Sequence, residues 1–115
     1  MSRVVCAGLL ALLLHAQAGA ADSSPGGKIF QTRCASCHEG TLGPALADIV
    51  GRKAGTGGSG VHSRAMVESG IVWTRSSLRR FLADPAREVP GTIMPVRVED
   101  PKQLEDLLNY LEDMH

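Results

Sequence analysis

The sequence predicts an all-α fold, and three of its features support this class. Two segments begin with a helix-capping residue followed by proline, Ser24-Pro25 and Asp100-Pro101, which is typical of a helix start. Two segments, residues 78–82 and 104–111, place apolar residues three and four positions apart, as one face of a helix requires. No stretch shows the sustained alternation of apolar and polar residues that a half-buried strand would need.

The first expected helix follows Ser24-Pro25 and extends to Cys34. Residues 40–60 are rich in glycine, so we expect a loop there. It is not predicted to link two domains, because neither side is long enough to fold alone. A short helix is expected over residues 63–69, ended by Gly70 in the usual C-terminal manner.

The next helix is expected to begin after Thr74 as its cap. Leu78, Phe81 and Leu82 then fall on one face, and Pro85 predicts the end of the helix within a residue or two. That face should meet a bound cofactor or the terminal helices.

The last helix has the strongest signals. Asp100 caps it, Pro101 takes the first position and Gln103 stands where a capping box needs it. A stripe of four leucines follows, at Leu104, Leu107, Leu108 and Leu111. This stripe needs a partner, and we expect the helix before Cys34 to provide it.

The run Cys34-Ala35-Ser36-Cys37-His38 is the attachment signature of a c-type haem. The two thiols can each form a thioether with a vinyl group of the porphyrin, and His38 can then bind the iron. A disulfide oxidoreductase also uses a CxxC motif, but no strand precedes this one. A structural zinc site needs four ligands, and no second pair stands at zinc-finger spacing.

The second iron ligand is predicted to be Met94. It lies in Pro90-Gly91-Thr92-Ile93-Met94-Pro95, where two prolines stiffen the chain and can hold a thioether rigidly. Met66 and Met114 are interpreted as packing or surface residues. His62 is the rival ligand.

Residues 1–20 are predicted to be a secretory signal peptide, cleaved at about residues 18–21. Arg3 supplies the positive start, residues 4–14 are apolar, and small residues follow as cleavage sites. A permanent anchor is the weaker alternative, because a membrane-spanning helix needs about 20 apolar residues. Residues 21–115 would then form one domain, exported to a compartment such as the bacterial periplasm.

The balance of twelve basic and twelve acidic residues, with no basic block, argues against a nucleic-acid partner. No later segment resembles a membrane helix, so we expect no stable membrane insertion. We also expect the protein to be a monomer. The core is thin, with Phe30, Trp73, Phe81 and Tyr110 as its only aromatic residues. A bound macrocycle would fill it, so folding should be coupled to haem.

The chain resembles the class I cytochromes c, close to the mitochondrial and bacterial short-chain types, from Gly26 to Leu111. The shared landmarks occur in order: Gly26 and Phe30, the CxxCH run, Gly43-Pro44, Gly51-Arg52-Lys53, Ser63-Arg64-Ala65-Met66, Gly70-Ile71-Val72-Trp73, residues 90–95, and Tyr110-Leu111.

This resemblance implies three to five helices wrapped around one covalently bound haem, with His38 and Met94 as axial ligands. It further implies that the Pro44 carbonyl orients His38, and that Arg52 and the Trp73 indole N–H face a haem propionate. Three departures from the family pattern are His62 and Phe81, which replace tyrosines, and a shortened segment before Gly43-Pro44.

The expected function is one-electron transfer between redox proteins that dock transiently at the haem edge, without enzymatic activity. Two alternatives stay open at this point. One is a haem enzyme or a gas- or peroxide-binding protein with a labile Met94, and the other is an electron-entry subunit of a larger oxidoreductase. A modest basic docking patch near the edge is expected from Arg33, Arg87 and Arg97.

Overall fold

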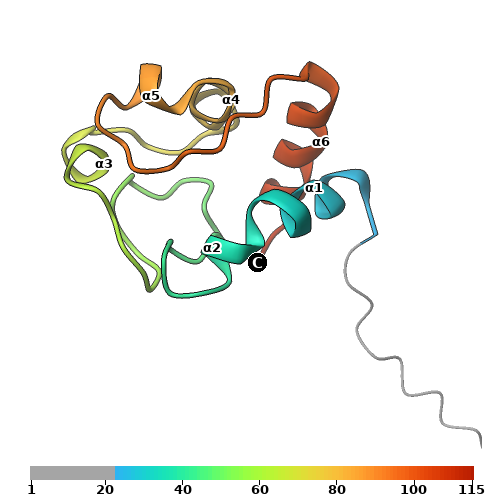
Figure 1. Cartoon of the computed structure of the whole chain (residues 1–115), viewed down its shortest axis with the longest axis horizontal. Coiled ribbons are helices and arrows are strands. Elements are labelled where there is room, and N and C mark those ends of the chain that lie inside the picture. The colour runs from blue at the N-terminus through green and yellow to red at the C-terminus, as the bar shows by residue number, and fades with distance from the viewer. Residues whose placement is uncertain (1–22) are drawn as a thin grey trace, which may run out of the picture.

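The structure, a computed structural model, describes residues 23–115. The predicted signal peptide lies outside these residues. The described part contains six helical segments, which surround a loop-rich centre (Figure 1). They are α1 (Pro25–Arg33), α2 (Ala35–His38), α3 (Arg64–Glu68), α4 (Arg75–Ala83), α5 (Pro85–Glu88) and α6 (Pro101–Glu112). The all-α prediction is confirmed, and one isolated antiparallel bridge joins Lys53 to Val72.

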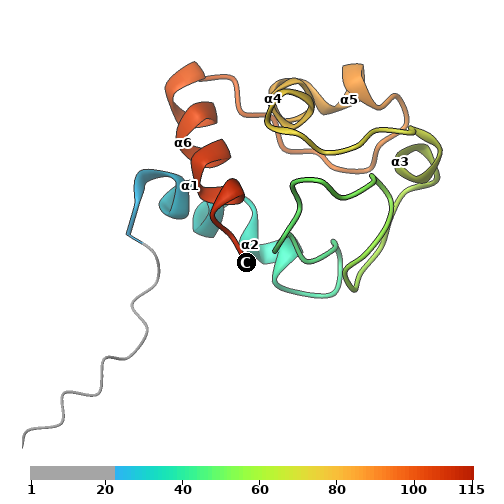
Figure 2. The same ribbon diagram turned by 180° about the vertical axis from the view of Figure 1, so that it is seen from behind.

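The expected contact between the first and last helices is present. Helices α1 and α6 lie against each other in both views of the ribbon (Figure 2). The four leucines of the predicted stripe are all buried, and Phe30 is 0 % exposed. The rings of Phe30 and Tyr110 lie 5.2 Å apart between their centroids. The approach is so close that a Cβ at Gly26 would lie 2.0 Å from the backbone oxygen of Asp106.

The predicted caps form at the ends of these helices. The side chain of Ser24 accepts a hydrogen bond from the backbone N–H of Gly27 at 3.0 Å. Oδ1 of Asp100 accepts one from the backbone N–H of Gln103 at 2.8 Å. A reciprocal capping box is seen at Thr74, whose hydroxyl and backbone N–H both pair with Ser77. Each cap satisfies amide groups that a helix start leaves unpaired.

Helix α4 ends at Ala83, within the range that Pro85 predicts, but the chain then forms one more helical turn. Asp84 serves as the C-cap of α4 and the N-cap of α5, and Pro85 takes the first position of α5. A proline stops one helix and is well suited to begin another, because its φ is already helical. This extra turn raises the number of segments in residues 23–115 above the three to five expected.

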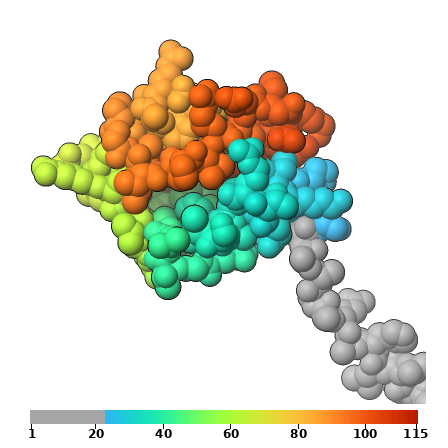
Figure 3. Space-filling model, viewed as in Figure 1, coloured from blue at the N-terminus to red at the C-terminus, as the bar shows by residue number. Residues whose placement is uncertain are grey.

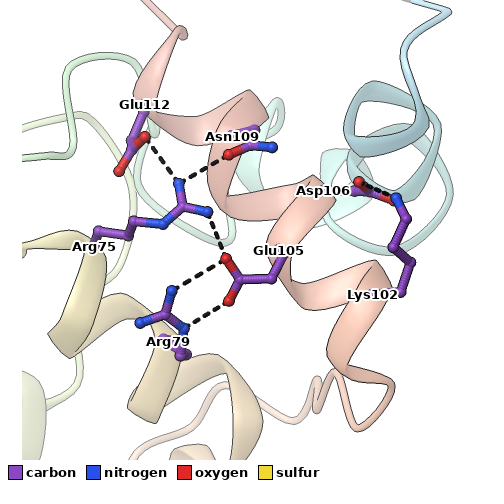
Figure 4. A network of polar contacts seen from close by, with 7 residues as sticks. All are labelled: Arg75, Arg79, Lys102, Glu105, Asp106, Asn109 and Glu112. Atoms are coloured by element: carbon purple, nitrogen blue, oxygen red, sulfur yellow. Dashed lines mark hydrogen bonds and ion pairs between the residues drawn. The ribbon is translucent and has the colours of Figure 1, made fainter.

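An ion-pair network joins α4 to α6 (Figure 4). Nε of Arg79 lies 2.7 Å from Oε1 of Glu105, and Nη2 of Arg75 lies 2.6 Å from Oε2 of the same carboxylate. Arg75 also contacts Asn109 and Glu112, each at 2.9 Å. Hydrogen bonds from both arginines lower the pKa of Glu105 to about 2, and the bond from Arg79 has the larger effect.

The segment of residues 89–98 is held at both ends by buried valines. The backbone N–H of Val89 donates to the Pro85 carbonyl, and that of Val98 donates to the Leu82 carbonyl, each at 2.9 Å. Val89 is 2 % exposed and Val98 is 0 % exposed. The residues between them, including Met94, therefore form a span with two fixed ends.

No helix within residues 23–115 is long and apolar enough to cross a membrane.

Candidate functional site

The two motif cysteines lie at the junction of α1 and α2. Cys34 caps the end of α1 by donating its backbone N–H to the Phe30 carbonyl, and its own carbonyl accepts from Cys37 and His38 at 3.2 and 3.0 Å. Both thiols are free. Cys34 is half-buried, and this burial raises the pKa of its thiol, whereas Cys37 is exposed. The backbone thus holds both thiols within one helical turn of His38.

The imidazole of His38 is oriented by the loop that follows α2. Its Nδ1 lies 2.7 Å from the carbonyl oxygen of Pro44. Because a carbonyl can only accept, Nδ1 carries the proton, and the lone pair of Nε2 is left to bind a metal. This is the contact that the family resemblance implies, while the role of Pro44 toward an iron-bound His38 stays a prediction.

Glycines bring the surrounding loop close to this imidazole. A Cβ at Gly43 would lie 3.0 Å from Nδ1 of His38. Behind it, Gly60 has φ +115°, and a Cβ there would lie 2.2 Å from the Gly43 carbonyl oxygen. The positive φ and the close approach both require glycine at position 60. Gly60 therefore packs directly on the Gly43-Pro44 segment, whose Pro44 carbonyl contacts His38.

Met94 comes from a different side of the molecule. It is half-buried, packs against the hydrophobic core and lies within the span of residues 89–98. The space-filling view shows a hollow between this span, coloured orange, and the teal and green chain that follows α2 (Figure 3). The segments that carry His38 and Met94 thus border the hollow from opposite sides.

Arg52 and Trp73 are brought together by backbone pairing. The N–H of Trp73 donates to the Arg52 carbonyl at 2.9 Å. The Trp73 side chain is buried, and its ring centroid lies 5.1 Å from that of Phe81. Nη2 of Arg52 donates to the Ala45 carbonyl at 2.8 Å, but its Nε is buried without a partner. An unpaired buried N–H is costly, so an acceptor on a bound group would stabilise Arg52 here.

These groups fit a covalently attached haem. Two free thiols stand beside an imidazole with an available Nε2, a half-buried methionine belongs to the span on the other side of the hollow, and a buried cationic N–H lacks an acceptor. Within residues 23–115, no three His, Cys, Asp or Glu side chains gather as a metal site would need, which leaves the zinc alternative without a ligand set there.

The rival ligand His62 and the other two methionines each make contacts of their own. Nε2 of His62 lies 3.0 Å from the Gly57 carbonyl oxygen. Met66 packs against the core from α3, and the carbonyl of Met114 accepts from the N–H of Asp48.

The expected basic patch is altered by contacts that the sequence analysis missed. The Arg33 guanidinium donates to the backbone carbonyl of Arg97. The Arg97 guanidinium lies 3.4 Å from Glu99 and 4.0 Å from Asp84. A backbone carbonyl acceptor cannot be predicted from the amino-acid sequence. The nearby acidic residues Asp84 and Glu99 could have predicted the ion pairs of Arg97.

The chain is similar to proteins of a known family. The family model described as "Cytochrome c" matches residues 23–115. Cytochrome c of Chlamydomonas reinhardtii is 35 % identical over 104 residues, covering 84 % of this chain and 93 % of the relative. Cytochrome c of Tetrahymena pyriformis is 37 % identical over 98 residues, covering 81 % and 89 %. The solved structure of cytochrome cH from Methylobacterium extorquens has a TM-score of 0.69 and 40 % identity, covering 76 % of this chain and 94 % of that one.

Proposed function

The chain belongs to the cytochrome c family, and from this premise we propose that it is a soluble periplasmic carrier that moves one electron at a time between redox proteins. Proteins of this family transfer electrons and carry one covalently attached c-type haem, which is the cofactor of this chain as well. We propose that the chain transfers electrons without chemically transforming a substrate.

One observation carries the assignment of the site: the contact between Nδ1 of His38 and the Pro44 carbonyl at 2.7 Å. It supports the tautomer with the proton on Nδ1, which leaves Nε2 available to bind a metal. In the proposal Cys34 and Cys37 hold the haem by thioether bonds. His38 and Met94 would be the two side chains that bind its iron.

Arg52 and Trp73 are proposed to bind a haem propionate. The buried Nε of Arg52 would then gain an acceptor, and the carboxylate would gain a charge partner away from water. The backbone pairing of the two residues keeps both groups in one place.

Bound haem supplies an iron that alternates between the ferrous and ferric states. The chain contributes two ligands that can stay in place during this change. His38 is fixed by Pro44, and the span that carries Met94 is anchored by Val89 and Val98. Little movement is then needed when an electron arrives, which favours a carrier over an enzyme with an open coordination position.

The ferric absorption spectrum tests the proposed ligands. A sulfur-to-iron charge-transfer band is expected in the unmodified protein, and Met94→Ala should abolish it. Met66→Ala and His62→Ala are the matched controls and should keep the band. Rapid binding of cyanide or carbon monoxide by the unmodified protein would instead support the alternative with a labile ligand and would overturn this proposal.

Periplasmic export rests on the leader of residues 1–20 and needs its own experiment. Cell fractionation and the mass of the purified holoprotein should place it in the periplasm, with an N-terminus at about residues 18–21. An intact leader in the cytoplasmic fraction would refute export.

Size-exclusion chromatography should give a monomer, since docking of electron-transfer proteins is transient and small in area.

A further inference from the structure

Asp48 is the only non-glycine residue within residues 23–115 that has a positive backbone angle, with φ +57°. Residues with a side chain rarely adopt this left-handed conformation, although aspartate tolerates it better than most. Asp48 lies in the turn of residues 46–49, where the Ile49 N–H donates to the Leu46 carbonyl at 3.1 Å. A rare backbone conformation persists only where other contacts hold it, so the contacts of Asp48 show what this turn is fixed to.

Asp48 is fixed to the chain that follows α6. Its backbone N–H donates to the Met114 carbonyl at 2.8 Å, and its Oδ1 lies 2.7 Å from Nδ1 of His115. Because a carboxylate accepts hydrogen bonds, Nδ1 of His115 is the donor. Met114 is itself joined to α6, since its N–H donates to the Leu111 carbonyl at 3.4 Å and its side chain packs against the core. We refer to the contacts of Asp48 with Met114 and His115 as the tail contact.

The same turn leads into Arg52. The backbone N–H of Arg52 donates to the Ile49 carbonyl at 3.1 Å, and its Nη2 reaches back to the Ala45 carbonyl at 2.8 Å. A Cβ at Gly57 would lie 2.8 Å from Cδ of Arg52, so the glycine-rich loop packs closely on this side chain. The acceptors that hold Arg52 thus lie at both ends of the turn that contains Asp48, and the position of its buried, unpaired Nε depends on that turn.

We propose that the tail contact positions Arg52: by holding the turn of residues 46–49 to the end of α6, it keeps Nε of Arg52 in place to bind a carboxylate of the haem. This inference rests on the proposed function, in which that carboxylate is a haem propionate. An arginine side chain loses much rotamer freedom when it is held at one acceptor, so a fixed turn makes this contact less costly to form. Asp48 and His115 act through Arg52 and are positioning residues.

Hydrogen exchange of the Arg52 Nε–H, measured by NMR on the ferrous holoprotein, reports how often this group opens to water. Low concentrations of urea leave exchange by local opening unchanged, whereas exchange by global unfolding accelerates with urea. His115→Ala removes the side-chain part of the tail contact without altering the turn. We expect urea-independent exchange at Arg52 to become about two- to fivefold faster, which is the effect of losing one exposed ion pair.

Glu68→Ala is the matched control, because it breaks the pair of Glu68 with Arg64, which is also 2.7 Å long and exposed. The control should leave exchange at Arg52 unchanged. Asp48→Gly tests the coupling, since glycine adopts a positive φ freely and only the carboxylate is lost. Adding His115→Ala to Asp48→Gly should have no further effect, because both changes remove the same contact. Asp48→Asn keeps an acceptor oxygen and tolerates the same φ, so it should exchange more slowly than Asp48→Gly.

Three outcomes would overturn the inference. The first is unchanged exchange at Arg52 in His115→Ala, and the second is an equal acceleration in the Glu68→Ala control. The third is an acceleration that depends on urea and is shared by the amides of the buried residues Leu107 and Leu108, which would show an effect on overall stability alone. Failure of the proposed function looks different, because the protein would then lack the sulfur-to-iron band or would not cycle reversibly between its two oxidation states.

Discussion

Replacing Gly26 by alanine tests the contact between the terminal helices. Gly26 lies in the first turn of α1, where α1 packs on α6. The added Cβ would lie 2.0 Å from the backbone oxygen of Asp106 and 2.8 Å from Cβ of Tyr110. Neither atom can rotate away, because one is backbone and the other is fixed to it. The two helices would have to separate.

The expected loss of stability follows from two opposing effects. Alanine favours a helix over glycine by up to about 1 kcal/mol. Overpacking a well-packed contact costs about 1–3 kcal/mol, and a backbone obstacle places this contact at or above the upper end. Separation also loosens the packing of Phe30, which is 0 % exposed. We expect a net decrease in the free energy of unfolding of about 3 kcal/mol, which corresponds to about 12–24 °C in Tm for a domain of this size.

The assay is equilibrium urea unfolding of the holoprotein, followed by far-ultraviolet circular dichroism. Gly40→Ala is the matched control, because its Cβ would find its nearest neighbour at 3.4 Å, an ordinary contact, and Gly40 has no positive φ. The control should stay within about 0.5 kcal/mol of wild type. A Gly26→Ala protein as stable as wild type, or two variants destabilised alike, would refute the packing argument.

Four further predictions follow from particular contacts. The pKa of Glu105 is lowered from its ordinary value of 4.5 to about 2 in the folded protein. Its ion pairs therefore contribute stability above pH 4.5 that is lost as the pH falls toward 2. Glu105→Gln should remove this part of the acid dependence of Tm, and an unchanged acid profile would contradict it. Thr74→Ala should lower the free energy of unfolding by about 1 kcal/mol, and Thr74→Ser should restore most of it, as denaturant titration can show. Gly43→Ala places a methyl group 3.0 Å from the His38 ring and should shift the NMR signals of that ring, which Gly40→Ala should leave in place. Replacing both motif cysteines by serine prevents covalent attachment, and the haem-free chain should lose most of its helical circular dichroism; full helicity without haem would disprove the coupling.

Local signals in the sequence were sufficient for the terminal helices. Ser24 and Asp100 cap the helices that they predict, and the leucine stripe of α6 is buried as its spacing requires. Periodicity also identified the buried face of α4. These features are short-range, so the residues that determine them lie within a few positions of each other.

Long-range contacts left little trace in the sequence. The pairing of Arg75 and Arg79 with Glu105 depends on how α4 crosses α6, which no local pattern specifies. The single turn of α5 was missed because Pro85 was interpreted only as the end of a helix. The site residues were named from a motif and a family resemblance. The buried, unpaired Nε of Arg52 became visible only in three dimensions.

The two valine anchors at the ends of residues 89–98 have a consequence for variation among such proteins. The backbone amides of Val89 and Val98 donate to carbonyls of α5 and α4, so both ends of the span are held without the side chains between them. Residues 90–97 can then be varied as a unit: a side chain with a different donor atom could replace Met94 while the helices keep their arrangement. Nature and the protein engineer could each retune such a molecule by rewriting that short stretch alone.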